Sequence, residues 1–281
     1  MQFFKADNHR GQNFLTPQFF NPVLQDARPL PDRDTTIDKR PVRGNRLLRH
    51  GAAFALHNDI GCKWNEATYQ VELARTLEKT KTAAIRELPI TVTFGQFSKT
   101  YQINLLVSQA GVYELKAVNA IDNAHIGQVL NYLRLVDATR AKIVNFRPFS
   151  VESKFVNCND TLEERQKFDI DGGEYKGPAV LRQVVNGMLR DLGTKLSVSL
   201  YNECVLANIG SVITMPTTPN AFVSQAFQMV EDAEAFTITS IESHACHHRE
   251  HLRKMASKAM LNAFHWINVT PKVIRLETIT P

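Results

Sequence analysis

The sequence predicts an α/β fold in which helices pack against a mixed sheet, and three observations support this. Two segments with apolar residues at helical spacing are followed by three runs of strand-forming residues. A further helix-like segment and a strand-like run come after them. Similar residues recur about 130 positions later, so we expect the fold to be duplicated in tandem.

The first two segments are predicted to be helices. Residues 45–59 repeat apolar positions at helical spacing, and Gly61 follows as a stop signal. Residues 65–79 carry a second apolar face, with Asn65 as a candidate N-cap. A helical pair therefore precedes the sheet.

The next segments are predicted to form the sheet and one more helix. The strand-like runs are 86–94, 99–108 and 112–118, and glycines stand in the turns between them. A helix over 124–135 and a strand over 141–146 complete the unit. The order α-α-β-β-β-α-β is typical of a mixed sheet covered by helices.

Side-chain alternation predicts where polar groups gather. Glu114 and Lys116 share one face of their strand, and Asn104 lies on the preceding strand. These three can face one cleft, and Glu66 on the second helix can complete the cluster. Taken alone, Glu66 also fits a solvated helix carboxylate, and Glu114 with Lys116 fits the polar face of a half-buried strand.

Four short motifs occur in this region in a fixed order. They are Gly61 with Glu66 and Tyr69; Asn104-Leu105-Leu106-Val107; Glu114-Leu115-Lys116; and Gln128 with Leu130-Asn131-Tyr132-Leu133. Together they resemble the GxxExxY family of the PD-(D/E)XK nuclease superfamily, over residues 44–148. The resemblance implies a restriction-endonuclease-like mixed sheet flanked by helices. Lys63 departs from the pattern, because it occupies the place of the naming glycine.

The resemblance also implies the residues of a nuclease site. The expected catalytic residues are Glu66, Asn104, Glu114, Lys116, Gln128 and Tyr132. The implied cofactor is Mg²⁺ or Mn²⁺, and its implied ligands are Glu66, Asn104 and Glu114. Lys116 would help to position the attacking water.

Asn104 is a second departure, because the family pattern has an aspartate there. An amide offers a cation one neutral oxygen, whereas hard divalent cations favour carboxylates. We therefore predict an impaired metal site and an inactive or very slow nuclease. The alternative is an active Mg²⁺-dependent nuclease, because Glu66 and Glu114 remain and substrate phosphate also binds the metal.

The second part of the chain resembles a degenerate copy. Residues 191–195 and Tyr201 repeat 59–63 and Tyr69 at an offset of 132. Further matches are 260–264 with 129–133, 272–274 with 142–144, and 235–240 with 112–117, at offsets of 131, 130 and 123. On this alignment the site residues are replaced by Val198, Thr237, Thr239 and Ala259. The alternative is chance similarity between two amphipathic α/β segments.

These patterns predict four regions. They are an extended N-terminal arm (1–43), a nuclease-like domain (44–157), an acidic linker (158–178) and a degenerate repeat (179–281). The arm is rich in proline and aromatic residues, which could dock on another domain or subunit.

The net charge of +5 comes mostly from the first 50 residues, which hold nine basic and five acidic residues. Arg43, Arg46 and Arg49 lie near one face of the first helix by their spacing. With His125, they are the residues we expect to bind nucleic acid. A solvated start of the helix is the alternative.

The composition bears on the cellular location, and three classes of function remain. Four cysteines without paired spacing and the lack of a long apolar run predict a cytoplasmic protein with no membrane partner. The first function class is a nucleic-acid-binding protein with a damaged nuclease site. The others are a working nuclease and a structural or protein-interaction module, with a protein partner or a homo-oligomer.

Overall fold

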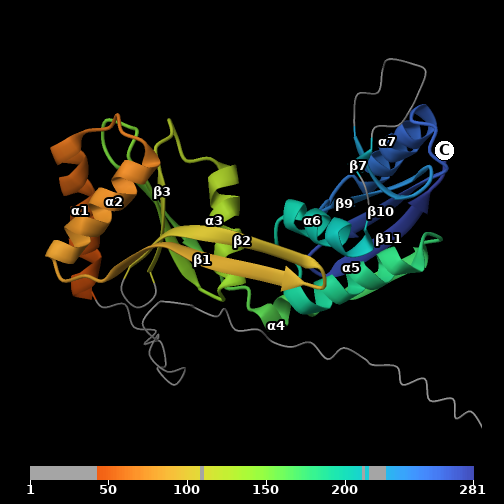
Figure 1. Cartoon of the computed structure of the whole chain (residues 1–281), viewed down its shortest axis with the longest axis horizontal. Coiled ribbons are helices and arrows are strands. Elements are labelled where there is room, and N and C mark those ends of the chain that lie inside the picture. Colours follow the sequence, from red (N-terminus) through yellow and green to blue (C-terminus); the bar gives the residue numbers. More distant parts are fainter. Residues whose placement is uncertain (1–42, 108–110, 211–212, 215–225) are drawn as a thin grey trace, which may run out of the picture. The chain divides into compact units, whose positions relative to one another are not determined.

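The computed structural model of the chain describes residues 43–107, 111–210, 213–214 and 226–281 (Figure 1). The side chains of residues 43–50 and 213–214 are not described. The predicted N-terminal arm lies outside the described residues up to residue 42.

The first half has the predicted order of elements and one more strand. Its elements are α1 (Arg43–Ile60), α2 (Glu66–Lys79), β1 (Ala84–Phe94), β2 (Phe97–Val107), β3 (Gly111–Lys116), α3 (Asn123–Leu135), β4 (Arg140–Asn145) and β5 (Glu152–Asn157). The α/β fold class is thus confirmed, and predicted boundaries differ from these by at most two residues. β5, which the sequence patterns did not indicate, pairs with β4 at the edge of the sheet.

The five strands form a mixed sheet in the order β1-β2-β3-β4-β5, in which only β3 and β4 run parallel. Helices cover both faces of this sheet (Figure 1). Val144 packs in the core under α1 and α2, whereas its neighbour Ile143 packs against α3. This alternation explains why β4 reads as a continuous apolar run, since both of its faces are buried.

Gly61 and Asn65 determine where α1 ends and where α2 begins. Gly61 has φ +78 and follows α1, so glycine suits the left-handed turn that ends this helix. Tyr69 Oη donates to the Gly61 carbonyl at 2.8 Å. Asn65 caps α2 by accepting from the backbone N–H of Thr68 at 2.9 Å. These bonds fix the turn that brings the first residue of α2 to the sheet.

The second half contains a short helix and an edge strand followed by eight further elements. They are α4 (Leu162–Arg165), β6 (Asp169–Glu174), α5 (Ala179–Leu192), α6 (Val198–Ile209), β7 (Ile213–Thr214), β8 (Phe227–Glu231), β9 (Glu234–Thr239), α7 (Ala245–Lys258), β10 (Ala263–Val269) and β11 (Val273–Ile279). The strands form a second mixed sheet in the order β6-β11-β10-β9-β8-β7. β6 lies within the segment 158–178 predicted as a linker, and it pairs in parallel with β11.

From α5 onward, the second half repeats the element order of the first. The series α5-α6-β7-β8-β9-α7-β10-β11 has the same strand neighbours and orientations as α1 through β5, including one parallel pair, β9 with β10. Local bonds recur as well. Tyr201 Oη donates to the Gly193 carbonyl at 2.7 Å, as Tyr69 does to Gly61.

A second recurring feature is an asparagine at the end of two parallel strand pairs, β3 with β4 and β9 with β10. Asn145 donates to the Val118 carbonyl at 2.7 Å and accepts from the Val118 N–H at 3.0 Å. Asn268 makes the same two bonds to Ile241, each 2.8 Å long. The offset between these residues is 123, and the pairing of β3 with β4 maps onto that of β9 with β10 at the same offset.

Two expected correspondences in this half are wrong. Residues 260–264 do not match the helix 129–133, because they form a turn and the start of β10, while the corresponding helix is α7. Residues 272–274 enter β11, whereas β10 holds the place of β4. An apolar run beside an asparagine suits both helices and strands, so such short matches misled the alignment.

The tip of the β1–β2 hairpin contacts α6. Asn208 donates to the Phe94 carbonyl at 3.0 Å and accepts from the Gln96 N–H at 2.9 Å. Gly95 between them has φ +54, and a Cβ there would overlap the Asn208 amide oxygen. Lys99 forms an ion pair with Glu203 at 2.7 Å.

No helix within the described ranges has the length and apolar character needed to cross a membrane.

Candidate metal and nucleic-acid site

Three charged side chains meet where α2 begins beside β3. Lys116 Nζ lies 2.7 Å from Glu114 Oε1 and 3.7 Å from Glu66 Oε2. Glu114 is only 1% exposed, Lys116 is also buried, and Glu66 is partly exposed. The structure therefore brings together the helix carboxylate and both polar residues of the Glu-x-Lys strand.

β2 and β3 part at this cluster. Their backbone pairing ends at Leu105 with Tyr113, although β3 continues beside β4 as far as Lys116. Asn104 stands at the point of separation, and its Oδ1 accepts from the Leu115 N–H at 2.8 Å. The asparagine side chain thus replaces the next backbone bond of the ladder.

Asn104 is also held through its backbone. Gln70 on α2 donates to the Asn104 carbonyl at 2.7 Å. The backbone N–H of Asn104 interacts with Glu114 and lowers the pKa of that carboxyl. Asn104 therefore lies next to the charged cluster, but its amide oxygen already accepts a hydrogen bond.

Burial and charge act in opposite directions on the buried pair. Burial raises the pKa of Glu114, and the lowering effect of Lys116 does not fully offset it. Burial lowers the pKa of Lys116, but Glu114 and Glu66 outweigh it and leave that pKa above its ordinary value. Glu114 Oε2 is buried without a hydrogen-bond partner among the described residues. A ligand that reached this oxygen would satisfy it.

α3 supplies the other predicted residues. Gln128 donates to Tyr132 Oη at 2.9 Å. Tyr132 is buried, and its pKa is raised by burial and further by the charge of Glu114. Tyr132 thus lies within electrostatic reach of the cluster, while Gln128 is exposed. His125 forms a capping box with Asp122 at the start of α3 and is partly exposed.

The basic cluster on α1 is placed only in part. Arg43, Arg46 and Arg49 belong to the first turns of this helix, and their side chains lie outside the described residues. Their role in nucleic-acid binding stays a prediction.

Sequence reasoning missed Arg147, which follows β4. Its guanidinium donates to the carbonyls of Ala117, Cys62 and Trp64 at 3.2, 3.2 and 3.3 Å. It therefore ties the loop before α2 to the chain just after Lys116. A basic residue directly after a buried strand, parallel to the Glu-x-Lys strand, was the available signal.

In the second half, uncharged residues stand at the positions of the charged cluster. Val198, Thr237 and Thr239 occupy the places of Glu66, Glu114 and Lys116. Trp266 Nε1 donates to Thr239 Oγ1 at 2.8 Å. At the offset of 123, Gln128 corresponds to His251 on α7, and not to Ala259, which follows that helix.

The fold and the site together define a restriction-endonuclease-like domain, with two carboxylates and a lysine where two strands part. Residues 48–156 match the family model of the PD-(D/E)XK nuclease superfamily. This match runs from α1 into β5. No curated protein and no solved structure shows a significant match to the chain.

The two carboxylates are ligands of the kind that Mg²⁺ or Mn²⁺ takes. Glu66 and the unpartnered oxygen of Glu114 would hold it, because Mg²⁺ commonly takes one or two carboxylates and completes its shell with water and phosphate. Bound there, the ion would supply Lewis-acid stabilisation of phosphate charge. No group of three or more His, Cys, Asp or Glu side chains placed to hold a metal occurs in the described part of the chain.

Mn²⁺ binding is expected to weaken on acidification at a higher pH than for an exposed glutamate. A raised pKa means that Glu114 takes up its proton earlier as the pH falls, and the protonated acid competes with the metal. Mn²⁺ titrations followed by electron paramagnetic resonance over a pH series measure the midpoint. Glu114→Gln is the control: it should bind Mn²⁺ much more weakly, because it removes the charged ligand, and any remaining binding should lack this acid step. A midpoint at the ordinary glutamate value would contradict the prediction.

Proposed function

We propose that the protein binds nucleic acid through its nuclease-like first half, and that Asn104 weakens the metal site there. The Glu66, Glu114 and Lys116 cluster supports this, because it has two carboxylates and one lysine where the strands part. The free state of all four cysteines agrees with the reducing, cytoplasmic setting that we propose.

The observation that carries the proposal is the hydrogen bond of Asn104. Its amide oxygen is neutral and is already bonded to the Leu115 N–H. A third ligand in the family pattern would be a carboxylate, which carries charge and has a second oxygen. The site therefore keeps the means to approach a phosphate, while its hold on a divalent cation is reduced.

An active Mg²⁺-dependent nuclease is the second candidate, favoured by Glu114. Its Oε2 is buried and has no partner in the residues described, a state that costs free energy unless a ligand occupies it. Substrate phosphate would supply the oxygen that Asn104 lacks. Cleavage assays with Mg²⁺ and Mn²⁺ distinguish the two candidates.

We also propose that the first half is of the GxxExxY type and that the second half is a degenerate copy of it. Support comes from the shared order and orientation of the elements, the paired tyrosine bonds and the paired asparagine bonds. The proposed copy keeps the arrangement of helices and strands but has no counterpart of Glu66 or Glu114. Its function is then structural, or lies in binding a partner protein or a second copy of the chain.

Changing Arg43, Arg46 and Arg49 together to alanine is expected to weaken binding to DNA and to flatten its salt dependence. Cations on one helix face release counterions when they meet phosphates. Fluorescence anisotropy over a series of salt concentrations measures both quantities. The matched control removes three positive charges from exposed sites on α7, at Arg253, Lys254 and Lys258. Equal affinity and salt slope in both variants would reduce the α1 cluster to a solvated surface.

A further inference from the structure

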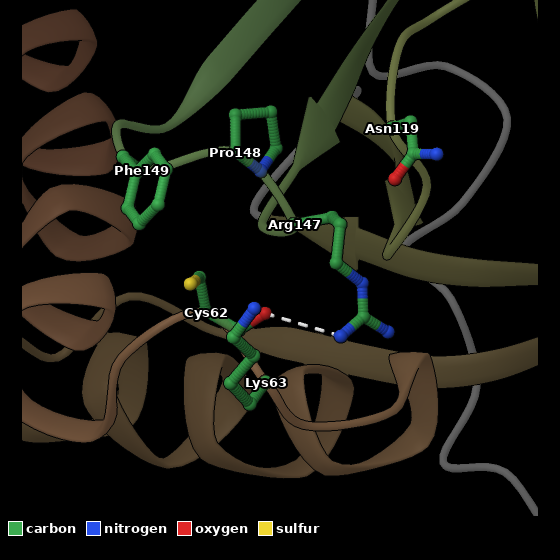
Figure 2. A pocket seen from close by; sticks show the side chains of 6 residues that line it. All are labelled: Cys62, Lys63, Asn119, Arg147, Pro148 and Phe149. Atoms are coloured by element: carbon green, nitrogen blue, oxygen red, sulfur yellow. Dashed lines mark hydrogen bonds between the residues drawn. The ribbon is translucent and has the colours of Figure 1, made fainter.

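A pocket of about 260 Å³ lies between the chain that enters α2 and the chain that follows β4. It is lined by Cys62 and Lys63 before α2, Asn119 after β3, and Arg147, Pro148 and Phe149 after β4. Figure 2 shows Phe149 and Pro148 on one side, with Cys62 and Lys63 on the other. Its volume is just below the roughly 300 Å³ at which pockets for small ligands begin.

The walls of this pocket continue directly into the site. Lys63 is three residues before Glu66. On the other wall, the Phe146 N–H donates to the Lys116 carbonyl at 2.8 Å, and Arg147 follows in the chain. The pocket and the charged cluster are thus connected along both chain segments, so one ligand could contact both.

The pocket is positively charged. The contacts described for the Arg147 guanidinium all go to backbone carbonyls, so no carboxylate neutralises it there. Lys63 is exposed and has no ion pair within the described part of the chain. Two cations without acidic partners attract an anion such as a phosphodiester.

Aromatic rings border the same region. Phe149 is 96% exposed and Trp64, next to Lys63, is 52% exposed. The indole N–H of Trp64 donates to the Ile60 carbonyl at 2.8 Å, and this bond holds the orientation of the indole ring. Exposed aromatic rings beside basic groups form stacking platforms for the bases of single-stranded nucleic acids.

We propose that this pocket receives one unpaired base of a single-stranded nucleic acid, which stacks on Phe149 while Lys63 and Arg147 hold the adjoining phosphate. The inference rests on the proposed function and names its substrate class. A base inside a duplex is stacked and paired, so it cannot enter the pocket without being flipped out. The protein therefore prefers single strands to duplexes of the same sequence.

Phe149→Ala tests the stacking contact. Because this side chain is almost fully exposed, its loss leaves the core intact. Anisotropy with a labelled single-stranded oligonucleotide should show affinity reduced about tenfold, within the range for one stacked base. Duplex affinity should change less than about twofold. The matched control is Phe155→Ala, an exposed phenylalanine on β5 that does not line the pocket.

Cys62 gives a second readout that does not depend on a variant of the aromatic ring. Cys158 and Cys204 are buried, so in a Cys246→Ser background Cys62 is the accessible thiol. A single-stranded oligonucleotide should slow its reaction with a maleimide, whereas a duplex should not.

The outcomes separate the two proposals. Salt-dependent binding with Phe149→Ala equal to Phe155→Ala, or with Cys62 unprotected, overturns the pocket assignment and leaves the proposed function standing. No binding of single strands, duplexes or RNA by the wild type overturns both. A peptide partner that protects Cys62 where nucleic acid does not would assign the pocket to protein binding instead.

Discussion

Asn104→Asp is expected to raise the affinity for Mn²⁺ by on the order of tenfold, because it adds a charged oxygen beside Glu114 and Glu66. The substitution is expected to preserve the local fold. One carboxylate oxygen can still accept from the Leu115 N–H, as the amide oxygen does now. The second oxygen replaces an amide nitrogen, which cannot bind a cation.

Isothermal titration with Mn²⁺ compares this variant with the wild type. Asn123→Asp is the control for added charge, since Asn123 is an exposed residue at the start of α3. Glu114→Ala should abolish binding in either background. If neither the wild type nor Asn104→Asp binds metal, the interaction-module alternative gains support.

The same variants should be compared in cleavage assays on single-stranded DNA, double-stranded DNA and RNA. Asn104→Asp is expected to cut faster than the wild type, because Lys116 and Gln128 are still present. Strong wild-type cleavage that disappears in Glu114→Ala would establish the active nuclease and reject the impaired site.

Arg165→Ala is expected to lower the free energy of unfolding by about 3 kcal/mol, since it removes a charged donor from three carbonyls that are buried or partly buried. Arg165 is 2% exposed. Its guanidinium donates to the carbonyls of Leu192, Thr194 and Arg134, at 2.7, 3.1 and 3.0 Å. These acceptors belong to both halves of the chain, so one side chain stabilises their association.

Urea denaturation followed by circular dichroism measures this loss. Arg253→Ala is the matched control, because Arg253 is exposed on α7 and pairs only with Glu250 among the described contacts. Its effect should stay within about 0.5 kcal/mol. A loss below about 1 kcal/mol for Arg165→Ala would show that water replaces the guanidinium at these carbonyls.

The sequence predicted the first half well because its signals are local and repeated. Helical spacing ends at Gly61, Asn65 follows as a cap, and each strand is bounded by turn residues. β5 escaped notice, since its residues alternate poorly between buried and exposed positions. Such an edge strand depends on its partner β4 more than on its own pattern.

The residues of the charged cluster were predictable from the sequence, but their contacts were less so. Alternation places Glu114 and Lys116 together, and the structure pairs them. The bond from Asn104 to Leu115 could not be foreseen, because it depends on where two strands separate. Arg147 was missed for a similar reason, since its partners are backbone carbonyls that carry no sequence signal.

The side-chain bonds of Asn145 and Asn268, called tethers below, serve the fold and do not depend on the charged residues of the site. Each amide satisfies both backbone groups of one residue in the loop after the central strand, which neither aspartate nor leucine could do. In the first half this loop begins directly after Lys116, so the tether anchors the chain that carries the charge. In the second half it follows Thr239, where no charge needs placing. The requirement for asparagine therefore arises from the backbone alone, and the same sheet architecture occurs both with the acids and the lysine and without them.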